Sequence, residues 1–117
     1  MTIESLSAVT LAVANMARSV RFYTALGFDM RYGGEDADFT SFTAGGSYFN
    51  LALRDGYPGA GPWGRAIFYV SDVDAVYERA LAAGLQPSTE PRDAVWHERY
   101  FHVSDPDGHE ISFAKPI

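Results

Sequence analysis

The stretch SAVTLAVANMARSVRFYTALGF, residues 7–28, has the pattern of a strand, a capped helix and a glycine stop. Its first part alternates apolar Leu11 and Val13 with smaller residues, which is the period of a strand with two unlike faces. Asn15 then offers a side-chain oxygen to the free amides of a helix start. Gly27 ends the helical spacing, because glycine readily adopts the left-handed conformation found after helices. The stretch therefore predicts one strand followed by one helix.

A similar order returns at GRAIFYVSDVDAVYERALAAGL, residues 64–85. A shift of 57 residues brings Leu11 onto Phe68 and Gly27 onto Gly84. Further strands are predicted near residues 28–32, 39–44 and 48–53 in the first half, and near 86–88, 100–104 and 110–114 in the second. Each half is thus a βαβββ module. Because neither module alone covers the face of its sheet, we expect the two to pair into one curved mixed sheet with a concave cleft.

The glycine- and proline-rich stretch DGYPGAGPWG, residues 55–64, breaks regular structure and separates the two halves. We therefore expect a single α+β domain over residues 1–117. Within it, module one covers about 5–54, the linker about 55–64, and module two about 65–115.

Composition excludes several classes of protein. The chain has no cysteine, so disulfides, thiolate metal sites and cysteine nucleophiles are ruled out. No apolar run approaches the roughly 20 residues that span a bilayer. The net charge of −6 repels phosphate backbones, which argues against a nucleic-acid partner. The start MTIESLSAV lacks the features of a secretory signal, so the expected location is the cytoplasm, without membrane association.

Two motifs carry a resemblance to a known family. The runs RSVRFYTALGF, residues 18–28, and SDPDGHEISF, residues 104–113, lie in paired βαβββ modules and resemble the vicinal oxygen chelate superfamily. That superfamily contains glyoxalases, fosfomycin-modifying enzymes, extradiol dioxygenases and bleomycin-resistance proteins. The resemblance extends from about Ser5 to Pro116. It implies the fold and leaves the function open, because one fold hosts many functions.

The resemblance also implies where a metal would be held. In metalloenzymes of the superfamily, each module gives one ligand from its first strand and one from its last, usually histidine, glutamine or glutamate. These positions fall on Ala8, Asn50, Arg65 and Ser112. A methyl group, an amide, a cation and a hydroxyl are a poor ligand set for a transition metal. A slip of two residues would bring in Glu110 as one strong ligand. We therefore expect no metal and no other cofactor.

Strand alternation also predicts which side chains face the cleft, and these mix aromatic and polar groups as small-molecule pockets commonly do. The predicted ligand-binding residues are Thr10, Asn50, Trp63, Arg65, Tyr69, Trp96, Tyr100, His102, Glu110 and Ser112.

Several of these residues have a second interpretation. Arg65 can hold a ligand acid and Glu110 a ligand amine, or the two can neutralise each other across the sheet. His102 and Glu110 are candidates for proton transfer, or they are simply lining groups, so no catalytic residue is assigned. Trp63 and Trp96 either flank the mouth of the cleft or cap the core under long loops. His109 lies beside a predicted turn and is expected to be exposed.

The leading functional prediction is metal-independent binding or sequestration of a small aromatic or cationic molecule, as in bleomycin resistance. The alternative is a glyoxalase-like lyase or isomerase, or a dioxygenase-type enzyme, acting in the same cleft. A third hypothesis is a non-catalytic module that only dimerises. Relatives of this size often form homodimers, so the resemblance also implies a homodimer, and the cleft is formed either within one chain or across the dimer.

Overall fold

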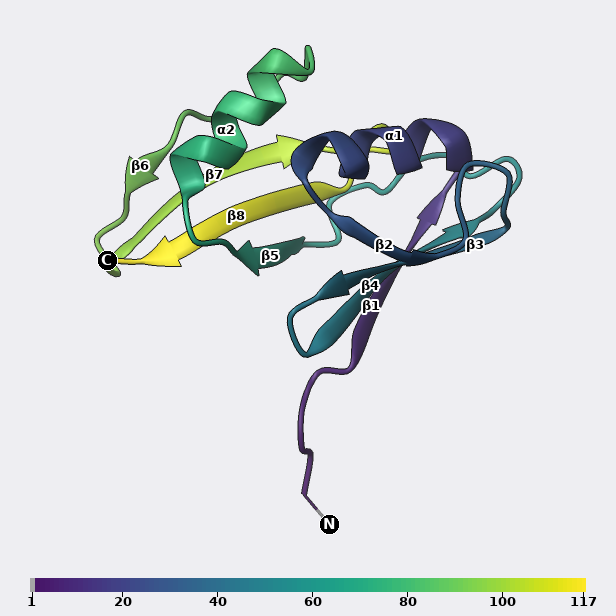
Figure 1. Ribbon diagram of the computed structural model, residues 1–117, viewed down its shortest axis with the longest axis horizontal. Coiled ribbons are helices and arrows are strands. Elements are labelled where there is room, and N and C mark those ends of the chain that lie inside the picture. Colours follow the sequence, from purple (N-terminus) through teal and green to yellow (C-terminus); the bar gives the residue numbers. More distant parts are fainter. Residues whose placement is uncertain (1) are drawn as a thin grey trace.

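The computed structural model describes residues 2–117 and confirms an α+β fold of two βαβββ modules. Module one contains β1 (Ala8–Val13), α1 (Met16–Leu26), β2 (Asp29–Tyr32), β3 (Phe39–Ala44) and β4 (Ser47–Leu53). Module two contains β5 (Arg65–Tyr69), α2 (Val73–Ala82), β6 (Arg92–Asp93), β7 (Glu98–Ser104) and β8 (Glu110–Pro116). Both helices lie on the same side of the strands, and the N-terminal segment extends away from the other side (Figure 1).

The predicted helix caps form as expected. The side chain of Asn15 accepts a hydrogen bond of 3.0 Å from the Arg18 amide, and Asp72 accepts one of 3.0 Å from the Ala75 amide. Gly27 follows α1 with φ of 101°, a left-handed conformation that costs glycine little. The duplicated sequence pattern therefore sets the ends of two helices in equivalent places.

The eight strands form two sheets instead of the single sheet expected from the sequence. Their orders are β1-β4-β3-β2 and β5-β8-β7-β6, and among residues 2–117 no strand pairing joins one sheet to the other. Aromatic side chains of the two modules pack against each other. Phe68 of β5 contacts Phe28 and Phe49 of module one, with ring centroids 4.9 and 5.0 Å apart. Side-chain packing, and not backbone hydrogen bonding, therefore joins the modules.

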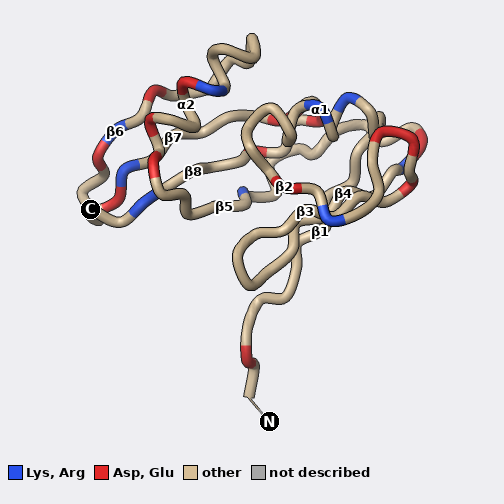
Figure 2. The backbone as a smooth tube through the Cα atoms, in the orientation of Figure 1, with Lys and Arg blue, Asp and Glu red and all other residues tan. Residues whose placement is uncertain are grey.

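The core lies between the helices and the sheets. Its largest fully buried side chains are Tyr23, Phe42, Phe49, Phe101 and Phe113. Each sheet turns its other face away from the helices. Acidic residues gather in the connection between β2 and β3, at one end of the molecule (Figure 2). Within the described part of the chain, neither helix is long and apolar enough to cross a bilayer.

The prediction of a strand at residues 86–88 is wrong, because the short strand β6 lies at Arg92–Asp93. Ser88 does approach β7, since its amide donates a hydrogen bond of 2.8 Å to the His102 carbonyl. Pro87 and Pro91 lack the N–H group that a continued ladder would need. The ladder with β7 therefore forms only after the second proline.

Candidate functional site

The turn Asp105–Gly108 fastens module two to helix α1 of module one. Asp105 Oδ2 accepts a hydrogen bond of 2.6 Å from the Tyr23 hydroxyl. The Asp107 carboxylate accepts bonds from the Ala14 amide at 3.0 Å and from the Ser19 hydroxyl at 3.3 Å. Burial raises the pKa of Asp105, although the bond from Tyr23 opposes this shift. These contacts set how the two sheets face each other.

His109 is buried beside this turn, so the expectation that it is exposed is wrong. It is 3% exposed, and its Nε2 lies 2.8 Å from the Ala12 carbonyl. Its Nδ1 accepts a hydrogen bond of 2.9 Å from Trp63 Nε1. With Nδ1 as an acceptor, Nε2 carries the proton and donates it to Ala12. The histidine is buried because the turn folds against module one, which local sequence does not reveal.

Trp63, near the end of the linker, is therefore bonded to His109 of module two. Trp63 is 47% exposed, and its role in ligand binding stays a prediction. Trp96 is 60% exposed and stacks on Tyr100, with ring centroids 5.7 Å apart.

The side of the second sheet that faces away from the helices is here called the open face of the second sheet. Strand register places Arg65 opposite Glu110, Ile67 opposite Ser112, and Tyr69 opposite Ala114. Strand β7, which pairs with β8, places Tyr100 opposite Ala114 and His102 opposite Ser112, so both lie on this open face. The structure thus brings together most of the predicted ligand-binding residues of module two, namely Arg65, Tyr69, Tyr100, His102, Glu110 and Ser112, with Trp96 beside them.

Arg65 and Glu110 pair with each other, at 2.9 Å between Arg65 Nε and Glu110 Oε2. Their side chains are 45% and 34% exposed, so water screens the pair and its contribution to stability is small. The pair neutralises both charges on the open face, as one of the two interpretations from sequence proposed.

His102 is held by Ser112, whose hydroxyl oxygen lies within hydrogen-bonding distance of His102 Nδ1. Partial burial lowers the pKa of His102, and the positive charge of Arg65 lowers it further. The imidazole is therefore neutral at neutral pH and able to accept a proton.

Glu98 lies beside the predicted ligand-binding residues and was not predicted from the sequence. It accepts a hydrogen bond from the Tyr69 hydroxyl and another, of 3.0 Å, from Trp96 Nε1. It forms no ion pair among the residues described. Alternation along β7 was the available signal, since Glu98 has the same parity as Tyr100 and His102. The predicted strand began two residues too late to include it.

A groove of about 520 Å³ lies between the edge strands of the two modules. Module one contributes Ala8, Val9, Tyr48 and Phe49, and module two contributes Arg65–Tyr69. Arg65 and Tyr69 are the predicted ligand-binding residues that line it. Its walls are mainly apolar and aromatic, and Ile67 and Tyr69 are 59% and 65% exposed.

Thr10 and Asn50 lie on the open face of the first sheet, the side that faces away from α1. They are opposite each other in register, and Asn50 Nδ2 donates a hydrogen bond of 3.2 Å to Thr10 Oγ1. The other amide atom, Asn50 Oδ1, is buried without a hydrogen-bond partner. This pair does not line the groove between the modules.

The residues at the four superfamily ligand positions do not fit a divalent metal. Ala8 has no donor, the Arg65 cation is paired with Glu110, and the Ser112 hydroxyl is engaged by His102. Within residues 2–117, no group of three or more His, Cys, Asp or Glu side chains is placed to share a metal ion.

Two βαβββ modules with a groove between their edge strands define the class of protein. The model of the Glyoxalase/Bleomycin resistance protein/Dioxygenase superfamily matches residues 5–113, and the chain belongs to that superfamily.

Solved structures share this fold over nearly the whole chain. A glyoxalase/bleomycin resistance protein/dioxygenase from Nocardioides is 23% identical, with a TM-score of 0.71, over 100% of this chain and 86% of that one. TioX from Micromonospora sp. ML1 is 25% identical, with a TM-score of 0.75, over 97% and 100%. A lactoylglutathione lyase from Agrobacterium tumefaciens is 16% identical, with a TM-score of 0.75, over 98% and 96%.

Uncharacterized proteins from Mycobacterium bovis and Mycobacterium tuberculosis are 46% identical over 48 residues, which is 41% of this chain. The matched stretch spans 32% of the first protein and 28% of the second.

Proposed function

We propose that this protein binds and sequesters a small aromatic or cationic molecule without a metal ion, as a bleomycin-resistance protein does. The observation that carries the proposal is the chemistry at the four superfamily ligand positions. They hold Ala8, Asn50, Arg65 and Ser112, and the Arg65 cation lies where a metal ligand would be needed.

The groove supports an aromatic ligand. Tyr48, Ile67 and Tyr69 expose apolar surface along its walls. Contiguous exposed apolar surface commonly marks a binding site, because covering it removes unfavourable contact with water. A flat aromatic ring in the groove would cover this apolar surface.

Glu98 supports a cationic group on the ligand. Its carboxylate is flanked by Tyr69 and Trp96, which hold it by hydrogen bonds and present electron-rich rings. A carboxylate beside aromatic rings attracts an ammonium group by charge and by cation–π contact. Glu110 is less suited to this role, because Arg65 already neutralises it.

A homodimer is part of the proposal. The edge strands β1 and β5 both border the groove, and edge strands left open attract other chains. A second copy seated there would cover the groove and complete the site. Sedimentation velocity of the purified protein is expected to give a dimer, and a monomer at micromolar concentration would remove this part of the proposal.

The test uses protein treated with a chelator and then dialysed. Calorimetric titrations with metal-free bleomycin and with benzyltrimethylammonium are expected to show one site per chain, unchanged by added zinc or nickel. Glu98→Gln is expected to weaken the binding of both cations, whereas Glu78→Gln on the surface of α2 serves as the control. Tight binding of one divalent metal per chain, or ligand binding that requires the metal, would contradict the proposal.

Two cellular expectations follow. Expression in a sensitive bacterial strain should raise its tolerance to bleomycin-type antibiotics, and the protein should fractionate with the cytoplasm. Unchanged tolerance combined with absence of binding in vitro would rule out the resistance role.

An enzyme is the second candidate, favoured by one observation. His102 has a lowered pKa and is oriented by Ser112, which suits a general base. Turnover of the hemithioacetal of methylglyoxal and glutathione tests a glyoxalase-like reaction. Activity that is lost in His102→Gln and retained in His97→Gln would favour the enzyme over sequestration.

A further inference from the structure

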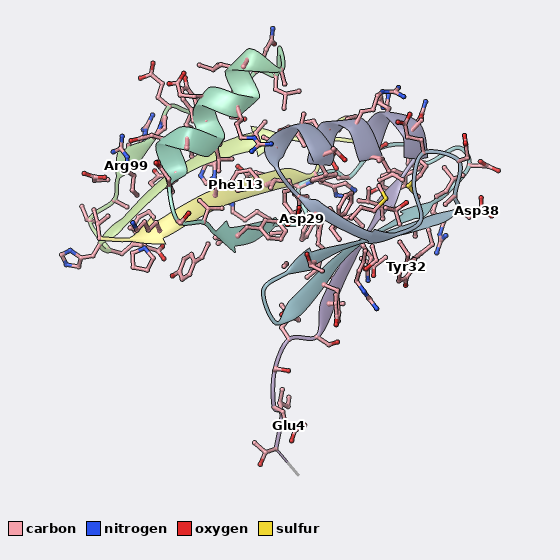
Figure 3. The ribbon with its side chains drawn as sticks, in the orientation of Figure 1. Glu4, Asp29, Tyr32, Asp38, Arg99 and Phe113 are labelled. Carbon is pink, nitrogen blue, oxygen red and sulfur yellow. The ribbon has the colours of Figure 1, made fainter. Side chains whose placement is uncertain are left out.

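Strand β2 contains a bulge that places Tyr32 on the open face of the first sheet beside Arg31. Met30 pairs with Phe42 and Tyr32 pairs with Ser41, so the register shifts and Arg31 is left over. A bulge of this kind re-aims a side chain and is frequent beside binding sites. Tyr32 lies on the side of the sheet away from α1 (Figure 3). Arg31 reaches Tyr48 and Ser41 of the neighbouring strands on that same side.

Arg31 is fixed by aromatic and polar contacts. The guanidinium carbon lies 4.0 Å from the centre of the Tyr48 ring and 5.0 Å from that of Tyr32. Its Nη1 donates a hydrogen bond of 3.4 Å to the hydroxyl of Ser41, which is fully buried beneath it. Stacking between two rings orients the planar guanidinium before any ligand arrives, so less conformational freedom is lost on binding.

No ion pair neutralises this cation. Among the residues described, Arg18, Arg21, Arg65 and Arg99 each pair with a carboxylate, whereas Arg31 does not. The acidic residue nearest along the strand, Asp29, forms no ion pair with it either. A fixed, planar, uncompensated guanidinium is suited to the two oxygens of a carboxylate.

A second observation beside Arg31 points to a ligand. Ser41 is opposite Asn50 in the register of β3 and β4. Asn50 Oδ1 is buried and has no hydrogen-bond donor in the structure. A buried acceptor without a donor is unfavourable, and a donor from a ligand would relieve the cost. The cation and the unpartnered acceptor lie over neighbouring strands of one face.

We infer that the open face of the first sheet binds the carboxylate of a small aromatic acid through Arg31. Asn50 Oδ1 then accepts a hydrogen bond from a hydroxyl or N–H group beside the acid. Tyr48 joins this subsite to the groove, because it stacks on Arg31 and also lines the groove wall. The inference rests on the proposed function, since the aromatic part of the acid occupies the same groove, and it adds an acidic group to the ligand class.

The test compares 3-hydroxy-2-naphthoate with its neutral analogue 3-hydroxy-2-naphthamide in titrations of ¹⁵N-labelled protein. The acid is expected to bind at least about tenfold more tightly than the amide, the effect of one charge-assisted hydrogen bond. The largest shift changes are expected at the amides of Arg31, Ser41 and Tyr48. Arg31→Gln should abolish the preference for the acid.

The matched control is Arg54→Gln. Arg54 also forms no ion pair among the described residues, and its contact is with the backbone carbonyl of Leu53. This variant is expected to bind the acid within twofold of wild type. Arg31→Lys keeps the charge but loses the planar stack on Tyr48, so intermediate affinity is expected. It also provides the test if Arg31→Gln fails to fold, in which case wild-type affinity in the lysine variant would overturn the inference.

Equal affinity for the acid and the amide, or wild-type affinity in Arg31→Gln, would overturn the inference. If the acid fails to bind while benzyltrimethylammonium binds in the groove, the inference falls and the proposed function stands. If no aromatic probe binds, both fall.

Discussion

The hydroxyl of Tyr23 donates a hydrogen bond of 2.6 Å to Oδ2 of Asp105, although the two residues are 82 positions apart. Tyr23 is fully buried in module one, and Asp105 begins the turn between β7 and β8 of module two. This bond joins the modules through their interior. Burial, followed by the nearby charge of Asp105, raises the pKa of Tyr23 well above its usual value, so the phenol remains a donor at physiological pH.

Removing this donor should destabilise the protein. Tyr23→Phe keeps the ring that packs on Phe49 but leaves a buried carboxylate oxygen without its partner. We expect a loss of about 1–3 kcal/mol in the free energy of unfolding, measured by urea denaturation. Tyr77→Phe is the control, because that ring packs on Phe101 and its hydroxyl has no hydrogen bond among the described residues. Equal effects of the two changes would show that the bond contributes nothing.

Asp105 should make stability depend on pH. Burial raises its pKa in the folded protein, so the folded state holds the proton more tightly than the unfolded chain does. Its stabilising contribution is therefore present below the ordinary value of 3.8 and is lost as pH rises through the folded pKa. Asp105→Asn should match wild type at the lowest pH and become progressively more stable relative to it as pH rises. A difference that does not change with pH would contradict this account.

His102 should titrate below its ordinary pKa of 6.5, because partial burial and then the Arg65 cation disfavour its charged form. As pH falls, the unfolded chain takes up this proton at a higher pH than the folded protein does. The free energy of unfolding therefore decreases as pH falls from 6.5 through the folded pKa of His102. An NMR titration of the imidazole measures the midpoint, and Arg65→Gln is expected to raise it. A midpoint at or above 6.5 would remove His102 as a neutral base.

Gly33 should tolerate no side chain. Its φ is 95°, and a Cβ atom there would lie 2.4 Å from the Phe39 carbonyl oxygen. Gly33→Ala is expected to cost about 1–3 kcal/mol of unfolding free energy and to disturb the adjacent bulge at Arg31. Gly46→Ala has open space around the new methyl group, so a change within about 0.5 kcal/mol is expected in the same denaturation experiment.

Local patterns predicted the modules well, because capping and alternation act between residues close in the chain. Asn15 and Asp72 cap their helices as expected, and the strands of module one lie close to the predicted ranges. The same alternation placed Arg65, Tyr100 and His102 on one face of a sheet. These features need no knowledge of what lies across the molecule.

Local sequence patterns do not predict contacts between segments far apart in the chain. His109 was expected in solvent, but the turn that carries it folds against Ala12. Arg31 was overlooked, because its stacking partner Tyr48 lies two strands away in the sheet and that contact has no local signature in the sequence.

The sequence by itself determined two equivalent modules, because short-range periodicity is written directly in the chain. The ligand positions Ala8, Asn50, Arg65 and Ser112 came from the family resemblance, and their poor fit to a metal stays a prediction. Only the tertiary structure decided that the modules keep separate sheets, that Arg65 is neutralised while Arg31 and Glu98 form no ion pair in the described chain, and where the groove lies. Those outcomes depend on packing and charge pairing between segments far apart in sequence, whose distances are set only when the two modules come together.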